Sequence, residues 1–574
     1  MIQIFKKFYR LLNRHQRNRV VILFFMMLVG AGFEVLGVSM MLPLVSAVMN
    51  PDIITENAVC AWFCRVLGIE SHVGFLIFCI ITLVAIYIVK AAYLTFEYFI
   101  QYRFVYNNRF MTQEKLLQAY LNRPYEYFLA AQSGEIVRIV QEDANNAFNM
   151  LTTLLGVVTE TMVAMAVITT IFVINPLMTS FVAVMLLLVM VVISKGIRPL
   201  LRREGQAYQK AYAETNKWLL QSISGIKEVK VTRTERFFHD HFVHYGKRLV
   251  EAARWNSTLQ NVPRNLIELV SVCSMMVVFG IMIATGYKLD SLIPSLSAFV
   301  MAAMKLLPSA NRIIGGITQA SFYEPALNNM LENLGVLKEE TGGSKAVEAI
   351  ALEKEIRLAG IDYTYPGGER KIFDGVDFVI PVGSSVGIIG TSGAGKTTAV
   401  DILLGLLKPQ AGKILVDGVD VSGNMDGWLS HVGYIPQMIF MLDGTIRENI
   451  VFGHKGDGEV DRGVWAALNE AQLADFVRSL PDGLDTAIGE RGVRLSGGQR
   501  QRIGIARALY TNPDVLIFDE ATSALDNETE EAIMQSINSL HGKKTMVIIA
   551  HRLSTIGECD MVYRAGDGKI VRER

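Results

Sequence analysis

The feature that most constrains this chain is a set of six long apolar runs, each reaching or approaching the length that crosses a lipid bilayer. A helix rises about 1.5 Å per residue, so about 20 apolar residues cross the hydrocarbon core. The runs lie near residues 20 to 49, 73 to 100, 151 to 174, 177 to 201, 265 to 288 and 291 to 312. With 51% hydrophobic and only 19% charged residues over 574 positions, one ordinary soluble domain is excluded. We therefore predict an all-α membrane domain with six helical spans.

The charge pattern orients these spans. The first nineteen residues contain six basic side chains, and the first acid of the chain is Glu34. The positive-inside rule places such an N-terminus in the cytoplasm. The first run is too long for the apolar core of a signal peptide, so we interpret it as a retained anchor. Six spans then return the chain to the cytoplasm, and the long polar stretches 101 to 150 and 202 to 256 are predicted to lie on that side.

The composition of the sequence changes after about residue 330. A polar, charged stretch follows, and no apolar run of spanning length occurs beyond it. Short β-branched runs such as "SSVGIIG", "KILVDG" and "DVLIFDE" then alternate with helical segments, which is typical of an α/β domain with a largely parallel sheet. We predict a membrane domain over 1–330, a linker over 331–350 and a soluble α/β domain with a phosphate loop over 351–574.

A phosphate-binding loop opens the soluble domain. The stretch "GTSGAGKT" fits GxxxxGK[ST] between an apolar strand and a helical segment, the context that this motif requires. Glycines let backbone amides wrap phosphate oxygens, the lysine reaches the β and γ phosphates, and the final threonine can bind Mg²⁺. The predicted nucleotide-binding residues here are Gly390, Thr391, Ser392, Gly393, Ala394, Gly395, Lys396, Thr397 and Thr398.

An apolar strand ending in two acids, "VLIFDE", follows some 120 residues later. Asp519 is placed to hold Mg²⁺ through water, and Glu520 to polarise an attacking water. Together with the phosphate loop, this pair predicts ATP hydrolysis with Mg²⁺ as the metal.

The stretch "LSGGQRQRIGIARAL" lies just upstream of that acidic strand, and the combination resembles the ATP-binding cassette (ABC) ATPases. The resemblance implies roles for matching positions. Tyr365 would stack on adenine, Gln437 would complete the metal site beside Thr397 and Asp519, and His551 would act as a switch residue with Glu520 in catalysis. "GERG" at 489 to 492 and "SALD" at 523 to 526, with Asp526, match two further family loops. Ser496, Gly497, Gly498 and Gln499 form the signature itself.

One phosphate loop and one signature per chain imply a dimer. In the family that the chain resembles, the signature of one subunit closes over the γ-phosphate bound by the other. Two complete sites thus imply a homodimeric half-transporter with twelve spans, and a heterodimer stays open. The stretches 123 to 146 and 222 to 238 resemble the two cytoplasmic loops of ABC exporters, each of which would carry a short coupling helix to an ATPase domain.

Four cations fall within or beside the predicted spans, from mid-membrane to the inner boundary: Lys90, Arg264, Lys305 and Arg312. A charge facing lipid near the centre costs about 2.5 to 3.5 kcal/mol, so a cavity that carries an anionic substrate would explain the deeper ones. Structural alternatives are open: Arg264 pairing with Glu268, Lys90 and Arg312 extending to the inner headgroups, or Lys305 neutralising Glu34 or Glu160.

The run "LLPSANRIIGG", "VPR" at 262 to 264 and a lysine late in span two resemble the ABC flippases of lipid-linked oligosaccharides that serve bacterial protein N-glycosylation. The resemblance implies that the four cations receive the pyrophosphate of an undecaprenyl-diphosphate glycan in a bacterial inner membrane. A short external helix over 51 to 72 would match the same family, with a packed loop as the equal alternative. Val59, Trp62, Phe63, Val66 and Leu67 would form its apolar stripe.

Two rival functions remain. A drug or other-lipid exporter would share this architecture, whereas a non-transporting ABC ATPase acting on DNA or ribosomes would not need six apolar spans. The zero net charge gives no support to nucleic-acid binding. The five cysteines form no disulfide pattern, although Cys60 and Cys64 share a local segment.

Overall fold

A computed structural model of the chain describes residues 6–9, 12–39, 48, 62, 65–66, 68, 71–174, 176–284, 289–340, 349–454, 459–520, 534–535, 537–550 and 556–574. The chain forms two compact units. Unit 1 contains residues 1–123 and 131–341, and unit 2 contains residues 124–130 and 342–574. The stretch 51 to 72, where an external helix was predicted, lies largely outside the described residues, as do His551, Asp526, Cys60 and Cys64.

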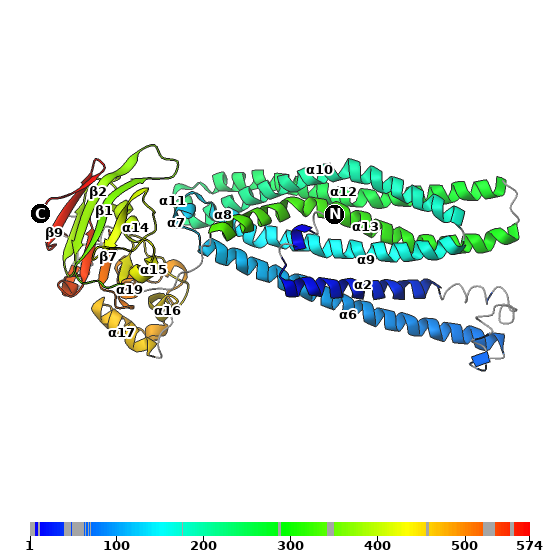
Figure 1. Cartoon of the computed structure of the whole chain (residues 1–574), viewed down its shortest axis with the longest axis horizontal. Helices are drawn as coiled ribbons and strands as arrows, with labels where there is room; N and C mark the ends of the chain where they lie inside the picture. The colour runs from blue at the N-terminus through cyan, green and yellow to red at the C-terminus, as the bar shows by residue number, and fades with distance from the viewer. Residues whose placement is uncertain are drawn as a thin grey trace. The chain divides into compact units, whose positions relative to one another are not determined.

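Unit 1 is built from long helices, which lie beside one another in Figure 1. Their bounds are α2 (Arg14–Ser39), α6 (His72–Leu121), α8 (Ser133–Val137), the π-helical turn η1 (Arg138–Asp143), α9 (Ala144–Ile174), α10 (Pro176–Ser224), α11 (Ile226–Thr232), α12 (Glu235–Ala284) and α13 (Leu289–Glu340). Within the described residues, three helical stretches are long and apolar enough to cross a membrane: Arg14–Glu34, His72–Leu121 and Ser133–Thr169.

The remaining predicted spans fall on α10, α12 and α13, apart from residues 285–288, which lie outside the described residues. The helix α13 continues to Glu340, so the first half of the segment that we expected to be a linker is helical. This difference follows from the sequence around 320 to 340, which keeps an apolar face although it is too polar to cross a membrane.

The helices of unit 1 pack closely against one another. The strongest pairings join α9 to α13 and α10 to α12, while α2 packs on both α6 and α9. A Cβ added at Gly316 of α13 would overlap the Val157 side chain of α9, so the small residue lets the two backbones meet. The Tyr93 hydroxyl of α6 donates to the Met26 carbonyl of α2 at 2.9 Å.

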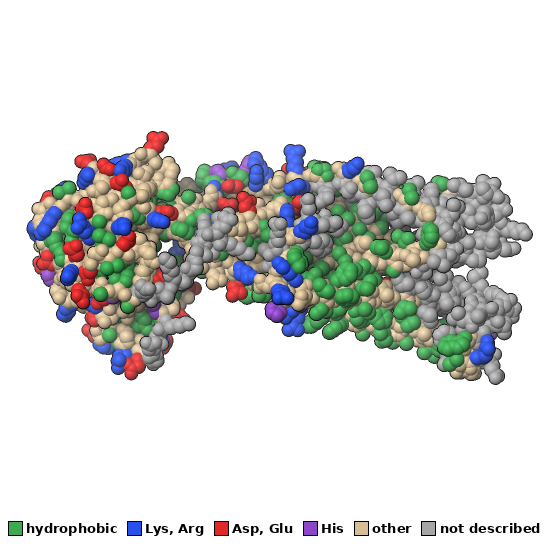
Figure 2. All heavy atoms as spheres, in the orientation of Figure 1, with side chains coloured by type: hydrophobic (Ala, Val, Ile, Leu, Met, Phe, Trp, Pro, Cys, Tyr) green, Lys and Arg blue, Asp and Glu red, His purple; other side chains and the backbone are tan. Residues whose placement is uncertain are grey.

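The outer surface of α2 and α6 is apolar. Figure 2 shows hydrophobic side chains gathered over this part of the molecule. They include Phe25, Leu28, Ile81, Val84 and Ile88, all exposed. An apolar surface this continuous is characteristic of a face that meets lipid.

Unit 2 contains two sheets. The first is antiparallel, in the order β2-β1-β4-β5, with β1 (Glu355–Thr364), β2 (Lys371–Pro381), β4 (Ala411–Val416) and β5 (Val419–Asp420). The second has the order β10-β9-β3-β8-β7-β6, with β3 (Ser385–Ile389), β6 (Val432–Ile435), β7 (Val515–Asp519), β8 (Thr545–Ile549), β9 (Met561–Gly566) and β10 (Lys569–Arg572). Its strands are parallel except for β10.

The helices of unit 2 are α7 (Tyr125–Ala130), α14 (Lys396–Leu403), α15 (Met425–Leu429), α16 (Ile446–Val451), α17 (Val460–Glu470), α18 (Ala474–Ser479) and α19 (Gly497–Leu509), with 3₁₀ turns η2 (Gly483–Asp485) and η3 (Glu490–Gly492). The α/β prediction is confirmed, but the prediction of one largely parallel sheet was incomplete. "KILVDG" belongs to the antiparallel sheet through β4. A strand's own residues do not specify its partner, because pairing joins segments far apart in the chain.

One core of unit 2 fills the space between the sheets and α14. Ile356, Phe378, Val386, Ile402 and Ile549 are all fully buried there. Trp428 is the largest of the fully buried side chains in the described residues, and its indole Nε1 donates to the Leu403 carbonyl at 2.8 Å. This packing fixes the C-terminal end of α14, whose N-terminal end carries the phosphate loop.

Candidate functional site

The phosphate loop joins β3 to α14. It runs from Gly390 to Gly395, and Gly395 caps α14 with a left-handed φ of 96°. A Cβ at Gly395 would meet Phe373 Cε1 at 2.9 Å, so both its conformation and its surroundings require glycine. The loop therefore presents backbone amides at a helix N-terminus, the arrangement that binds phosphate.

Lys396 is held inside this loop. Its side chain is buried, and Nζ donates to the carbonyls of Gly390 and Thr391 at 2.9 and 3.2 Å. An ammonium group fixed by the carbonyls of the phosphate loop is placed to neutralise phosphate oxygens. Thr397 and Thr398 follow it in the first turn of α14.

Asp519 ends β7 and is buried. The pKa of its carboxyl is raised, first by burial and then by the neighbouring charge of Glu520, while the hydroxyl of Tyr434 partly opposes the shift. Its Oδ1 is buried and has no hydrogen-bond partner within the described residues. A divalent cation would both satisfy that oxygen and compensate the charge, so Asp519, with Thr397 beside it, fits Mg²⁺.

Glu520 and Gln437 come together although 83 residues separate them. The Gln437 amide Nε2 donates to Glu520 Oε2 at 2.7 Å. Glu520 itself has a left-handed φ of 50°, and its backbone N–H donates to the Ile549 carbonyl at 3.0 Å. A non-glycine residue held in this left-handed region is strained, and such residues gather at functional sites.

Tyr365 lies beside the phosphate loop. Its hydroxyl and the Thr398 hydroxyl share a hydrogen bond of 3.0 Å, and its ring meets that of Tyr363 edge-on at 5.1 Å between centroids. The half-buried ring is thus fixed next to the helix that binds phosphate, where the sequence predicted an adenine contact.

The signature stretch begins α19. Ser496 caps this helix, and its side chain accepts from the Gln499 N–H at 3.2 Å while the Gln499 Oε1 accepts from the Ser496 N–H at 2.8 Å. Gly497 and Gly498 form the first turn. This capping box leaves further amides of the helix N-terminus available to an anion.

Two residues near the metal site were not predicted. Asp401 lies one turn after Thr397 on α14, and burial together with the charge of Asp519 raises its pKa to about 6. The Tyr434 hydroxyl donates to Asp519 Oδ2 at 3.5 Å. Both positions carried a signal, since Asp401 is four residues after a predicted ligand and Tyr434 belongs to the same "VGYIPQ" stretch as Gln437.

The short helix α7, from the first predicted cytoplasmic loop, belongs to unit 2 rather than to unit 1. The Glu126 Oε1 of α7 accepts from the Lys408 N–H, just beyond α14, at 2.9 Å. The Tyr125 side chain lies within electrostatic reach of Tyr434, which bonds Asp519. The helix therefore contacts the segment that follows the phosphate-loop helix, close to the metal-site residues.

In unit 1, two of the four predicted head-group cations have carboxylate partners. Lys90 Nζ lies 2.7 Å from Glu34 Oε2, and both side chains are largely buried. Arg312 pairs with Glu160, and 65% of the Arg312 side chain stays exposed, against 13% of the Glu160 side chain. Arg264 is exposed on α12, and the Lys305 side chain lies outside those that the structure describes. Glu34 thus pairs with Lys90, and Glu160 pairs with Arg312.

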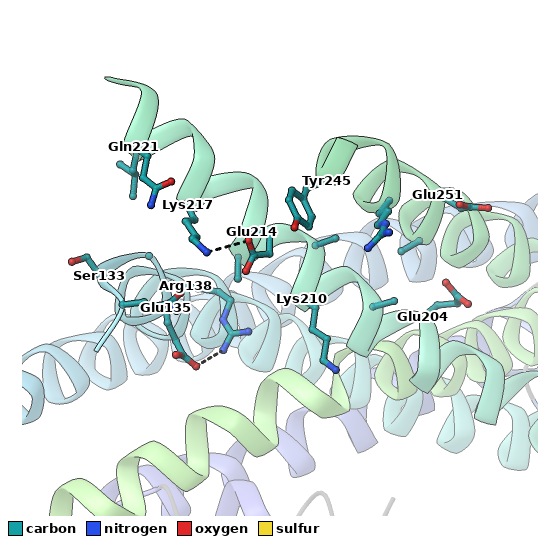
Figure 3. Close-up of a pocket in the computed structure, with 18 of the residues that line it drawn as sticks. Ser133, Glu135, Arg138, Glu204, Lys210, Glu214, Lys217, Gln221, Tyr245 and Glu251 are labelled. Atoms are coloured by element: carbon teal, nitrogen blue, oxygen red, sulfur yellow. Dashed lines mark hydrogen bonds and ion pairs between the residues drawn. The ribbon is translucent and has the colours of Figure 1, made fainter. Parts of the chain in front are cut away.

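A cavity of ≈ 1110 Å³ lies elsewhere in unit 1, between α8 with η1, α10 and α12 (Figure 3). Its lining carries four acids and four bases: Glu135, Glu204, Glu214, Glu251, Arg138, Lys210, Lys217 and Arg248. Lys217 pairs with Glu214 at 3.5 Å and Arg138 with Glu135 at 3.6 Å. The acids and bases of this lining balance, so the cavity carries no excess of positive charge that would favour an anion.

Models of two protein families match the chain. "ABC transporter" matches residues 373–523, and "ABC transporter transmembrane region" matches residues 21–304. Over its whole length the fold is similar to that titled "Structure of a bacterial Atm1-family ABC exporter with ATP bound", with a TM-score of 0.79, 23% identity, and coverage of 97% of this chain and 95% of that one.

Among curated proteins, the ATP-dependent lipid A-core flippase of Burkholderia orbicola (strain AU 1054) is 30% identical over 478 residues, which cover 81% of this chain and 78% of that protein. The multidrug resistance ABC transporter ATP-binding and permease protein of Lactococcus lactis subsp. lactis (strain IL1403) is 34% identical over 302 residues, 52% of this chain and 50% of that protein.

Proposed function

Because the chain belongs to the ABC transporter family as an exporter-type half-transporter, membrane-embedded and driven by ATP hydrolysis, we propose that it flips a polyprenyl-diphosphate-linked oligosaccharide. The lipid would move from the cytoplasmic to the outer leaflet of a bacterial inner membrane. Glycosylation of protein would consume it there. The functional unit would be a homodimer, in which Ser496 of each copy faces the nucleotide bound by the other.

The observation that supports an anionic lipid substrate is the pairing and exposure of Arg312. Glu160 holds one side of the guanidinium, while most of the side chain remains accessible. A planar guanidinium fixed in this way offers its remaining N–H donors to a diphosphate in a bidentate arrangement. Arg264, exposed on another helix, adds a second cation without a described ion-pair partner.

ATP hydrolysis at the nucleotide site supplies the free energy for transport. Lys396 and the loop amides would bind the phosphates of ATP, Glu520 would orient and polarise the attacking water, and Gln437 would hold Glu520 in register. Thr397, Gln437 and Asp519 would hold Mg²⁺, which supplies charge neutralisation at the phosphates when bound. The helix α7 would transmit closure of the ATPase units to the membrane helices through the hydrogen bond between Glu126 and the Lys408 N–H.

A phosphorylated glycolipid of the lipid A-core kind is the second candidate. The relatives described as lipid A-core flippases favour it. Both candidates share an anionic head group, sugars and lipid tails, so the distinction between them is the polyprenyl diphosphate itself.

The test is ATP-dependent flipping of a labelled undecaprenyl-diphosphate oligosaccharide in proteoliposomes. We expect Arg312→Glu to abolish flipping and leave basal ATP hydrolysis substantial, because the reversed charge repels the diphosphate without touching the nucleotide site. Arg254→Glu, on an exposed ion pair with Glu251, is the matched control and should flip at the wild-type rate. Glu160→Gln, which removes only the partner of Arg312, should retain flipping. Unchanged flipping by Arg312→Glu would contradict the diphosphate assignment.

A further inference from the structure

Three tyrosines on α6 form a ladder with a spacing of four residues: Tyr98, Tyr102 and Tyr106. Neighbouring ring centroids are 6.3 Å apart in both pairs, with interplanar angles of 25° and 41°. The side chains are 45%, 45% and 50% exposed. None of the three hydroxyls has a hydrogen-bond partner in the part of the chain that the structure describes. The ladder therefore presents aromatic surface and unused hydroxyl groups together.

Cations stand at both ends of this tyrosine ladder. The Arg109 guanidinium lies over the Tyr106 ring, 4.7 Å from its centroid, and Nη1 donates to Asn145 Oδ1 of α9 at 2.7 Å. At the other end, the Tyr98 phenol lies within electrostatic reach of Arg312 and Glu160. The ladder thus runs from a fixed arginine on α6 to the vicinity of the exposed arginine of α13.

The position of the tyrosine ladder along α6 argues against a simple interfacial anchor. In the predicted inward direction of α6, Tyr98 lies at the inner end of the predicted span 73 to 100. It is about 39 Å from the start of the helix, whereas the hydrocarbon core is about 30 Å thick. The ladder then extends about 12 Å further, whereas one interfacial layer is only about 5 to 8 Å thick. Interfacial tyrosines gather at the depth of the headgroups. A row that continues past that depth toward the cytoplasm is accessible to a ligand from that side.

We propose that this tyrosine ladder binds the saccharide portion of a glycosyl-phosphate lipid head group as it enters from the cytoplasmic side. Tyrosine rings offer flat apolar faces to the C–H faces of sugar rings, while their hydroxyls hydrogen-bond sugar hydroxyls. Arg109 and Arg312 complement phosphate charge at the two ends. The inference rests on the proposed function, and it adds a sugar contact to the cation contact already assigned.

The experiment compares two probes on the full-length protein in lipid nanodiscs without ATP: an undecaprenyl-diphosphate oligosaccharide and undecaprenyl diphosphate without sugar. For wild type we expect tighter binding of the sugar-bearing lipid. Replacement of all three tyrosines by leucine should weaken that binding about tenfold or more, to the level of the sugarless lipid, because three stacking contacts are lost. Binding of the sugarless lipid should not change.

Matched variants isolate the sugar contact. Phe96→Leu, about 120° around the helix from Tyr102 and also exposed, should bind both lipids as wild type does. Replacement of the three tyrosines by phenylalanine keeps the stack and should retain most of the sugar-dependent gain. The single variant Tyr102→Leu, which leaves both neighbours in place, should lose part of the gain and serves where the triple leucine variant does not fold.

Three outcomes would overturn the proposal: an unchanged preference for the sugar-bearing lipid in Tyr102→Leu and the triple leucine variant, an equal loss for both lipids, or loss of the dimer in size-exclusion chromatography with light scattering. The last would assign the tyrosine ladder to contact between copies. Failure of the proposed function looks different, because wild type would then bind a lipid A-core probe but neither polyprenyl lipid. In that case the tyrosine ladder remains a sugar site only if the leucine variants bind the lipid A-core probe more weakly than wild type does.

Discussion

In the ATPase unit, side chains distant in sequence meet in one network: Gln437 donates to Glu520, and Tyr434 contacts Asp519. In the membrane unit, two of the cations predicted to bind substrate are each held by a carboxylate from another helix. The nucleotide site is therefore assembled around groups that still need a ligand, such as Asp519 Oδ1. The cation sites are partly neutralised before any ligand arrives. From this difference we infer that recognition of the nucleotide depends on fixed geometry, whereas recognition of the proposed substrate would depend on how much charge each ion pair leaves accessible.

The largest expected effect tests the nucleotide side of this comparison. Glu520→Gln should retain ATP binding and lose about 10² to 10⁴ in the rate of hydrolysis, because an amide cannot act as the positioned base. Phosphate release and nucleotide binding measure the two properties separately. Glu470→Gln, exposed at the end of α17, is the control and should hydrolyse ATP normally. Near-normal hydrolysis by Glu520→Gln would remove that residue from catalysis.

The next effect tests whether the Lys90–Glu34 pair is structural. Glu34→Gln leaves a largely buried ammonium without its carboxylate, which should cost about 3 kcal/mol of stability. The double variant Glu34→Gln/Lys90→Gln should recover most of that loss. Thermal unfolding in a fixed lipid and detergent mixture compares the three proteins. A neutral Glu34→Gln would instead mean that Lys90 does not depend on Glu34 and is free to meet a head group.

A smaller effect concerns Asp401, where the raised pKa of about 6 predicts a pH dependence. In the unfolded chain this carboxyl has a pKa near 3.8. The ionised carboxylate therefore lowers the free energy of unfolding above about pH 6, and this loss becomes smaller as the pH falls toward 4. Asp401→Asn should therefore stabilise the protein at pH 8 by about 1 kcal/mol in the absence of Mg²⁺ and nucleotide. Below about pH 3.5, where the carboxyl is mostly protonated in both the folded and the unfolded state, the difference should nearly vanish. Asp482→Asn, at an exposed position, provides the control, and a gain that does not depend on pH would contradict the assignment.

The smallest effect addresses the contact of α7 within unit 2. Glu126→Ala removes the acceptor for the Lys408 N–H, a contact worth about 1 kcal/mol. We expect substrate stimulation of ATP hydrolysis to fall several-fold while basal hydrolysis persists, since the nucleotide site itself is intact. Glu114→Ala, exposed on α6, should leave both rates unchanged. Equal stimulation in Glu126→Ala and wild type would show that α7 does not transmit through this contact.

The sequence predicts site residues most specifically where function depends on a short local stretch. The phosphate loop, the capped start of α19 and the acid pair after β7 each bring their own backbone geometry, so their residues could be assigned before the fold was described. The pairing of β4 in an antiparallel sheet could not be predicted, because it depends on a distant partner.

The ion pairs of unit 1 illustrate the same limit. Arg312 meets Glu160 across 152 residues. The structural alternatives drawn from the sequence had placed Lys90 and Arg312 at the inner headgroups and had offered Glu34 and Glu160 to Lys305. The tyrosine ladder was open to prediction from its four-residue spacing on one helix, but its significance depends on Arg109, Asn145 and Arg312, which only the packing of α6, α9 and α13 brings near.

The most direct measurement of the central claim is the ATP-dependent transfer of labelled undecaprenyl-diphosphate oligosaccharide across proteoliposomes, with a labelled phospholipid in the same vesicles. We predict transfer of the diphosphate lipid by wild type, little transfer of the phospholipid, and none of either lipid by Glu520→Gln. Equal rates for the two lipids would contradict a flippase that selects its substrate through Arg312 and the neighbouring cations.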